Sequence, residues 1–479
     1  MKNKTLAILL LLVFILTTGF GCKVQSTEVK AGLKPIKLTY WRVWDDQDAF
    51  ASQITKYQLV HPNVSIEYRK FRYEEYESQL LDAFAEDRGP DIFSIPNTWV
   101  KRYVNKIEPL PDSTTLVFKV TQGTIKKEVI DELRTNKTMT LKEVKNNFAD
   151  VVYGDVVAKG LDAKNLAKEQ ILALPLYVDT LALYFNKDLF NNAGIAEPPE
   201  FWNKTFQQDV KKLTKQDASG KIAQSGVALG GGTNIQRSFD ILSVLMMQNG
   251  AEMTTDSGGV IFNEKPKNTS VSYNPGPEAL RFYTDFGNPA KEVYSWNKDQ
   301  PDSLQLFTNG QLAMMFGYAY HLPMIKAAAP KMNFSVVKLP QIENSNQPVN
   351  YANYWVETVS KKILTNPENL KNGASYAKLK RDSAWDFVQF LSKEEQAKSY
   401  VQKAMRPTAL RSLVTKQGED PEIGIFASQV LTSKSWYQGK DVISAEKIFN
   451  DMIDQALLAP DNIDKIMDDA VSKVQQTIN

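Results

Sequence analysis

Cysteine and histidine are almost missing from this chain of 479 residues, which has one Cys, Cys22, and two His, His61 and His321. A single Cys excludes a disulfide scaffold, an iron–sulfur cluster and a cysteine-rich zinc site. Because the two His are far apart in the sequence, a His-based metal centre is not expected either. We therefore expect no metal and no cofactor.

The chain also lacks an excess of positive charge. It has 57 Lys and Arg against 55 Asp and Glu, and the two surplus lysines, Lys2 and Lys4, lie in the first 21 residues. The rest of the chain is neutral and has no basic block. Nucleic-acid binding is therefore not expected as its main function.

A run of apolar residues long enough to span a bilayer is missing too, since Leu6–Leu16 has 11 residues and a membrane-spanning helix needs ~20. Lys2 and Lys4 precede this run, and small residues follow it, which predicts an export signal over 1–21. The only Cys comes next. The arrangement resembles the lipobox of bacterial lipoproteins, whose Cys is acylated, although Gly19 stands where that pattern prefers Leu.

The resemblance implies a lipid on Cys22 that holds the protein to the membrane, a polar tether over 22–34 and a working part outside the cytoplasm. The alternative is an ordinary cleaved signal with an incidental Cys.

Strands and helices alternate at the start of the working part. Apolar residues alternate with polar ones over 37–41 and 64–68, and 91–95 is a short apolar run. Between these strands the apolar residues recur at helical spacing, which predicts helices there. Strands that alternate with helices are typical of a parallel α/β sheet. Ligands bind at the carboxyl ends of such strands, here 41–46 and 96–99.

Five segments further define the chain: Leu38-Thr39-Tyr40-Trp41 leading to His61-Pro62-Asn63-Val64, Gly89-Pro90-Asp91-Ile92-Phe93, Leu183–Phe190, Phe307–Met314 and Ala384–Leu391. In this order they resemble family 1 extracellular solute-binding proteins, the sugar-capturing components of ABC importers, for which a lipobox is the usual anchor. One stretch departs from the family. Residues 111–145 are charged, Thr-rich and weakly periodic, and are longer than the family normally carries there.

The resemblance implies an α/β, two-lobed periplasmic-binding-protein-like fold with the ligand cleft between the lobes and closure by a hinge. We expect lobe 1 to comprise 35–151 and 350–412, and lobe 2 to comprise 152–349 and 413–479. The protein would be a monomer without catalytic activity that delivers a mono- or oligosaccharide to ABC transporter permease subunits.

Sugar recognition needs flat aromatic faces and planar polar groups that pair with two hydroxyls. Aromatic, acidic, amide and Arg side chains near predicted strand ends and helix starts meet this need. The resemblance adds the loop around Asp179 and the aromatics after the strand 312–316. The candidate ligand contacts are Trp41, Trp44, Asp45, Asp46, Asn97, Trp99, Tyr177, Asp179, Asn234, Gln236, Arg237, Tyr318, Tyr320, Asn353, Tyr354, Trp355, Arg406 and Trp436.

Several of these residues also have a purely structural interpretation. Trp41, Tyr354 and Trp355 would then cover the core, and the acids Asp45 and Asp46 would cap a helix. The triple glycine 230–232 is not followed by Lys in phosphate-loop spacing, so it predicts close packing before a helix.

Two other functions remain open at this point. A glycan-active hydrolase needs two carboxylates at a set separation, and such a pair is available among 55 acids. A surface receptor or adhesin would use the same cleft without transport. Within the binding proteins, the ligand class is also open between sugars, polyols, phosphorylated polyols, polyamines and peptides.

Overall fold

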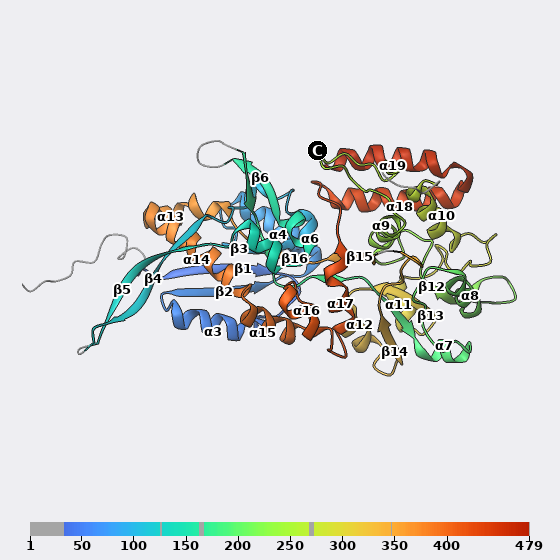
Figure 1. The fold of residues 1–479 in the computed structure, drawn as a ribbon, viewed down its shortest axis with the longest axis horizontal. Helices are drawn as coiled ribbons and strands as arrows, with labels where there is room; N and C mark the ends of the chain where they lie inside the picture. The colour runs from blue at the N-terminus through green and yellow to red at the C-terminus, as the bar shows by residue number, and fades with distance from the viewer. Residues whose placement is uncertain (1–32, 125–126, 162–166, 268–272, 346, 479) are drawn as a thin grey trace, which may run out of the picture.

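A computed structural model of the chain describes residues 33–124, 127–161, 167–267, 273–345 and 347–478. Two lobes lie side by side along the longest axis of the molecule (Figure 1). The expected export signal, Cys22 and all but the last two residues of the expected tether lie outside the described residues. Within those described ranges, no helix has the length and apolar character needed to cross a bilayer.

The first lobe is built on a sheet with the spatial order β2 (Val64–Lys70), β1 (Ile36–Arg42), β3 (Ile92–Pro96), β16 (Trp355–Val359) and β8 (Leu174–Pro175). β1 is parallel to β2 and β3, whereas β16 is antiparallel to β3 and β8. Ile36, Leu38 and Tyr40 are buried on one face of β1, because alternate residues of a strand share a face. The three strands predicted at the start of the chain are confirmed.

Helices surround this sheet. They are η1 (Gln47–Ala49), α3 (Ala51–Val60), α4 (Tyr73–Ala85), η2 (Asn97–Trp99), η3 (Val104–Lys106), η4 (Lys361–Leu364), α13 (Pro367–Lys371), α14 (Ala374–Leu391) and α15 (Glu394–Ala404). α14 is the longest of them, and it buries Trp385 and Phe387 completely.

The second lobe has a sheet with the order β11 (Lys215–Gln216), β12 (Ile222–Val227), β13 (Leu312–Gly317), β10 (Ala182–Asn186) and β14 (Phe334–Val337). Every residue of β10 and β13 is buried. Continuous apolar strands of this kind are typical of a sheet covered on both faces.

The covering helices of the second lobe are α7 (Lys187–Asn192), α8 (Lys204–Leu213), α9 (Ser238–Gln248), α10 (Pro275–Asp285), α11 (Ser303–Thr308), α12 (His321–Ala328), α18 (Val442–Leu458), η6 (Pro460–Asn462) and α19 (Ile463–Ile478). α18 and α19 pack on each other and on α10, and α18 also contacts α9. The end of the chain therefore belongs to the second lobe.

A small sheet joins the lobes where the chain crosses between them. Its strands are β17 (Ser433–Lys434), β15 (Asn350–Asn353) and β9 (Asp179–Thr180). Near it lie α5 (Leu141–Asn147), α6 (Asp150–Val156), α16 (Arg411–Gln417), α17 (Gly424–Gln429) and η5 (Val430–Thr432). Because β8 pairs with β16 in the first sheet, the chain first crosses after Pro175 rather than at the expected boundary of 152.

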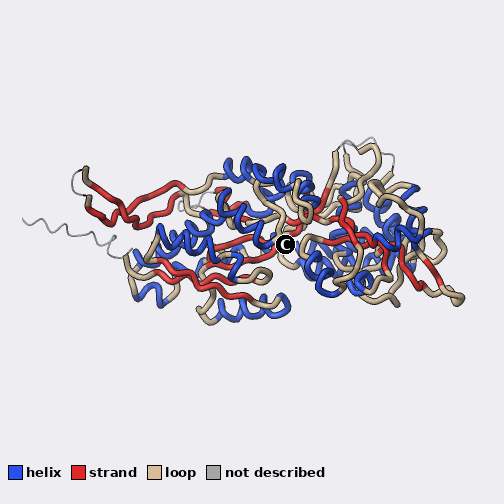
Figure 2. Tube along the Cα trace, turned by 90° about the horizontal axis from the view of Figure 1, so that it is seen from below, coloured by secondary structure: helices blue, strands red, loops and turns tan. Residues whose placement is uncertain are grey.

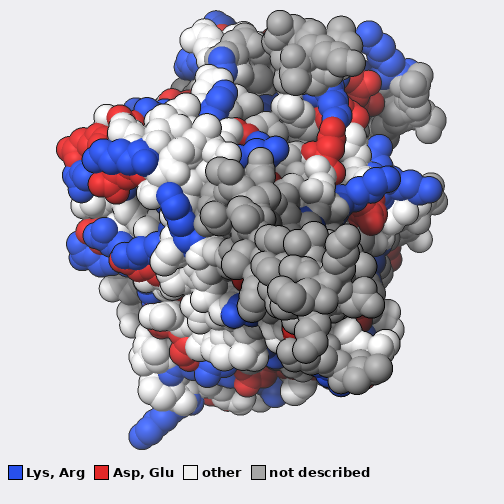
Figure 3. All heavy atoms as spheres, turned by 90° about the vertical axis from the view of Figure 1, so that its left-hand side faces the viewer, with Lys and Arg blue, Asp and Glu red and all other residues white. Residues whose placement is uncertain are grey.

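Two hairpins extend from the first lobe. β4 (Ser113–Gln122) and β5 (Glu128–Lys137) pair along their whole length, and β6 (Val157–Leu161) pairs with β7 (Ala167–Ile171). The first hairpin projects far beyond the sheet (Figures 1 and 2). It makes up most of the stretch 111–145, which the sequence predicts to be longer than in the family it resembles. Seen from the end of the molecule on which it lies, acidic and basic side chains are interspersed on the visible surface (Figure 3).

Candidate functional site

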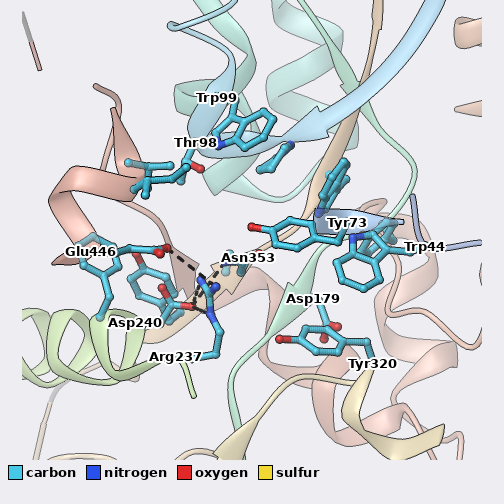
Figure 4. A pocket seen from close by; sticks show the side chains of 18 of the residues that line it. Trp44, Tyr73, Thr98, Trp99, Asp179, Arg237, Asp240, Tyr320, Asn353 and Glu446 are labelled. Carbon is cyan, nitrogen blue, oxygen red and sulfur yellow. Dashed lines mark hydrogen bonds and ion pairs between the residues drawn. The ribbon is translucent and has the colours of Figure 1, made fainter. Parts of the chain in front are cut away.

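A cavity of about 160 Å³ lies between the two lobes beside the crossing strands. Residues that follow β1 and β3 form one wall, and residues that follow β13 and precede or begin α9 and α18 form the other (Figure 4). The lining residues are Trp44, Tyr73, Pro96, Thr98, Trp99, Tyr177, Asp179, Arg237, Phe239, Asp240, Tyr320, Tyr351, Ala352, Asn353, Trp355, Arg406, Val442, Ile443 and Glu446. The cavity thus lies at the carboxyl ends of strands of the first sheet, where the α/β pattern predicts a ligand.

Stacked aromatic rings connect the lobes at this cavity. Trp44 follows β1, and its ring stacks on Tyr73 with a centroid separation of 5.6 Å and on Tyr320 with one of 5.8 Å. Since Tyr320 follows β13, the second stack joins the first lobe to the second. Trp355 meets Trp44 edge-on at 6.1 Å. Trp44 is 37% exposed, whereas Trp355 is buried.

Asp179 provides one of the two almost fully buried carboxylates of the cavity, at 1% exposure. Its Oδ1 accepts hydrogen bonds from the backbone N–H groups of Thr180 (2.9 Å) and Ala319 (3.0 Å). Its Oδ2 has no hydrogen-bond partner in the described part of the chain. Burial raises the pKa of the Asp179 carboxyl to about 7, and the nearby Arg406 guanidinium opposes this only in part.

Arg406 lines the cavity and is held from behind by Asp45. Its Nη2 lies 3.4 Å from Asp45 Oδ1, and the guanidinium lies over the ring of Tyr177, 5.2 Å from the centroid. Arg406 Nε has no partner among the residues that the structure describes. Burial alone would raise the pKa of the Asp45 carboxyl, but Arg42 and Arg406 hold it below its usual value.

A second charged group lies where α9 begins. Arg237 has a left-handed backbone conformation (φ 63°) and donates from Nε and Nη2 to Asp240 Oδ2, at 2.7 and 2.6 Å. Tyr318 and Asn353 donate to the same oxygen, at 2.6 and 3.4 Å. Glu446 of α18 is more distant, with its Oε1 3.9 Å from Arg237 Nη1, and burial raises the pKa of its carboxyl.

The loop before α9 is packed too closely to hold a phosphate. Gly230 has φ +93°, and a Cβ there would lie 2.2 Å from the backbone nitrogen of Gly287. A Cβ on Gly231 would lie 2.8 Å from the Trp296 ring. The prediction of close packing is confirmed, and this packing fixes the start of α9 and with it Arg237.

The structure brings half of the sequence-predicted contacts together at the cavity. These are Trp44, Trp99, Tyr177, Asp179, Arg237, Tyr320, Asn353, Trp355 and Arg406.

The other predicted contacts do not line the cavity, because each has a different partner. Trp41 packs on Phe71, Asp45 bonds to Arg42 and Tyr400, and Asp46 forms an exposed pair with Lys70. Asn97 and Tyr354 donate to Asp155, Asn234 binds Trp296 and two backbone carbonyls, and Gln236 binds Asp302 and His321. Tyr318 donates to Asp240, and Trp436 donates to Ser243 in an aromatic core.

Six polar or aromatic lining residues were not among the predicted contacts: Tyr73, Thr98, Phe239, Asp240, Tyr351 and Glu446. Two of them had a usable signal. Tyr73 begins α4, three residues after the carboxyl end of β2, and Asp240 is one helical turn from Arg237. Glu446 had none, since only the fold brings α18 to the cavity.

Comparison with known proteins gives a family match. A sequence model of the family described as bacterial extracellular solute-binding protein matches residues 44–398. The chain is 26% identical over 304 residues to the sn-glycerol-3-phosphate-binding periplasmic protein of Pectobacterium atrosepticum, which covers 60% of this chain and 61% of that protein. It is 26% identical over 224 residues to the maltodextrin-binding protein of Bacillus subtilis, covering 43% and 46%. The matches thus span about half of these curated relatives.

Solved structures match over nearly the whole chain. The cyclic alpha-maltosyl-1,6-maltose binding protein of Arthrobacter globiformis has a TM-score of 0.66 and 16% identity, with 93% of this chain and 99% of that one covered. An ABC transporter solute binding protein of Thermotoga lettingae, bound with alpha-D-tagatose, has a TM-score of 0.62 and 17% identity, covering 93% and 100%. The predicted two-lobed α/β fold is confirmed.

Proposed function

Because the chain belongs to the bacterial extracellular solute-binding protein family, we propose that it captures a carbohydrate-type ligand between its lobes and delivers it to the permease subunits of an ABC importer. In this proposal the protein is a monomer without catalytic activity that works outside the cytoplasm. Lipid on Cys22 anchors it to the membrane.

The observation that supports a carbohydrate is a cavity that combines aromatic faces with a buried acceptor and a buried donor, neither of which has a partner among the described residues. Asp179 Oδ2 needs a hydrogen-bond donor, and Arg406 Nε needs an acceptor. A hydroxyl group both donates and accepts, whereas an ammonium group only donates and an ionised phosphate mainly accepts. Trp44 and Trp355 offer flat surface for the apolar side of a sugar ring. A polyhydroxy ring therefore meets both needs.

Closure of the lobes supports the same function. The stack of Trp44 on Tyr320 forms only when the lobes approach, since each ring comes from a different lobe. The short crossing strands β9, β15 and β17 are the natural hinge. Closure removes the ligand from water, which strengthens its polar contacts with the cavity.

A ligand screen tests this function against its alternatives. Thermal unfolding of the protein is measured with sugars, polyols, phosphorylated polyols, polyamines and short peptides. A ligand at 100 times its dissociation constant adds about 2.7 kcal/mol to the stability. A shift with sugars supports capture of a carbohydrate. Products from a glycan substrate would instead support a hydrolase, and binding without uptake in cells that have the permease would support a receptor.

Replacing Trp44 by Ala should weaken sugar binding about tenfold or more, because it removes the ring that joins the lobes over the cavity. Isothermal titration calorimetry measures the change. Tyr273→Ala is the matched control, since Tyr273 is an exposed aromatic residue of the second lobe that does not line the cavity. Equal affinities of the two variants would contradict the assigned role of Trp44.

Replacing Cys22 by Ser should move the protein from the membrane fraction into the soluble fraction, because the side chain that carries the lipid is lost. Cell fractionation and immunoblotting measure this change. Mass spectrometry of the wild-type peptide that contains Cys22 is the direct check: an unmodified Cys22 would contradict the proposed anchor.

A further inference from the structure

The two Arg side chains of the cavity are already engaged by carboxylates. Arg237 donates twice to Asp240 Oδ2, at 2.6 and 2.7 Å. Arg406 pairs with Asp45 at 3.4 Å. A phosphate or carboxylate on a ligand would have to compete with these acids for either guanidinium group.

Two carboxylates of the same cavity are short of positive charge. In the described ranges, no cationic nitrogen lies within 4.0 Å of Asp179, which is 1% exposed, and its Oδ2 is unpaired. Glu446 accepts no hydrogen bond from a described residue, and its one close cation, at 3.9 Å, is the Arg237 that Asp240 already holds. Burial raises the pKa of both carboxyls, Asp179 and Glu446, as it does for acids without a full partner.

The charges of the site therefore do not balance. The cavity is lined by three acids, Asp179, Asp240 and Glu446, and by two Arg. Behind Arg406, Asp45 also pairs with Arg42, which in turn pairs with Glu357, so this layer adds two acids and one Arg. An enclosed cavity with excess negative charge favours a cationic ligand and disfavours an anionic one, since water that would screen the charges is displaced on binding.

We propose that the ligand carries a protonated amine that binds beside Glu446, so that the substrate class is an amino sugar or a similar aminated polyol. This inference rests on the proposed function of carbohydrate capture. The hydroxyl groups of such a ligand meet the needs of Asp179 and Arg406, and its ammonium group supplies the missing partner of Glu446. Figure 4 shows Glu446 and Asp179 on different sides of Arg237, which leaves each carboxylate to a different part of the ligand.

Matched sugars of different charge test the inference. Dissociation constants are measured by calorimetry at about pH 7 for the 2-amino, neutral and 6-phosphate forms of glucose, galactose and mannose. For the ring that binds best, we expect the amine to bind at least about tenfold more tightly than the neutral parent, and the phosphate to bind more weakly than both. A neutral parent that binds as tightly as the amine would overturn the inference.

A variant of Glu446 gives a second, independent measurement. Glu446→Gln keeps the size of the side chain, and should reduce the preference for the amine over the neutral parent to about one. Asp451→Asn is the matched control, because Asp451 is an exposed acid of the same helix that does not line the cavity. A preference that persists in Glu446→Gln would overturn the inference.

The two levels of the proposal fail in different ways. If sugars bind but without preference for the amine, carbohydrate capture stands and the amino-sugar assignment is overturned. If no sugar of any charge binds, the proposed function itself fails, and this inference falls with it.

Discussion

Replacing Asp179 by Asn is expected to stabilise the protein in alkaline solution while weakening its binding of sugar. The carboxyl of an unfolded chain has a pKa of about 3.9, whereas burial raises that of Asp179 to about 7 in the folded protein. Between these values the folded state holds a proton that the unfolded state has lost. The contribution of Asp179 to the free energy of unfolding therefore falls as the pH rises through this window and changes no further above it.

The pH-dependent part of this effect is about 4 kcal/mol, and it disappears in Asp179→Asn. The amide brings an unpaired N–H group that costs about 1–3 kcal/mol at every pH, so the comparison between two pH values is the informative one. In urea unfolding, the free energy of unfolding of the variant relative to that of the wild type should be higher at about pH 8 than at about pH 4. A difference that does not change with pH would mean that Asp179 titrates as an ordinary exposed acid.

Loss of binding is the other half of this prediction. Asn has an N–H group where Asp179 Oδ2 would accept a hydrogen bond from the ligand, so the dissociation constant should rise about tenfold or more. Asp451→Asn serves as the control for both measurements, because that acid is exposed on α18. A gain in stability joined to a loss of affinity is typical of a residue whose charge is kept for function.

The site residues that follow strands could be predicted from the sequence. The site residues that are positioned by contacts between segments far apart in the chain could not. Trp44 follows the strongly patterned strand β1, so its place near the cleft followed from the fold class, whereas Asp179, which lies in β9, was predicted from the family resemblance. Asp45 is adjacent to Trp44, yet its carboxylate turns inward to Arg42 and Tyr400. Arg42 is only three residues away, but Tyr400 is brought there by tertiary packing, so no local pattern reveals the inward turn.

The strands of the β4–β5 hairpin were not predicted from the sequence, because their apolar and polar residues alternate only weakly. Much of both strands is exposed or half-buried, so few apolar residues alternate with polar ones, and the sequence indicated only a charged stretch.

The first crossing between the lobes was predicted too early in the chain, at 152, for a related reason. β8 has only two residues, Leu174 and Pro175, and its pairing with β16 depends on a strand about 180 residues later in the chain.

Replacing Arg42 by Leu is expected to cause the largest loss of stability, about 3–5 kcal/mol, because it leaves Glu357 buried without its cation. Both side chains are 1% exposed or less, and Arg42 Nη1 lies 2.8 Å from Glu357 Oε1. Asp45 would keep its second partner, Arg406. Urea unfolding measures the loss, and Arg72→Leu is the control, since a fully exposed ion pair contributes little to stability.

The double variant Arg42→Leu with Glu357→Leu separates an unpaired charge from a loss of packing. It removes both buried charges, so at least half of the lost stability should return, although Tyr40 and Ser94 lose their acceptor. Sugar affinity should stay close to that of the wild type, because the pair of Asp45 and Arg406 remains in place behind the cavity. A double variant as unstable as Arg42→Leu alone would show that Arg42 acts through packing against its aromatic neighbours and not through Glu357.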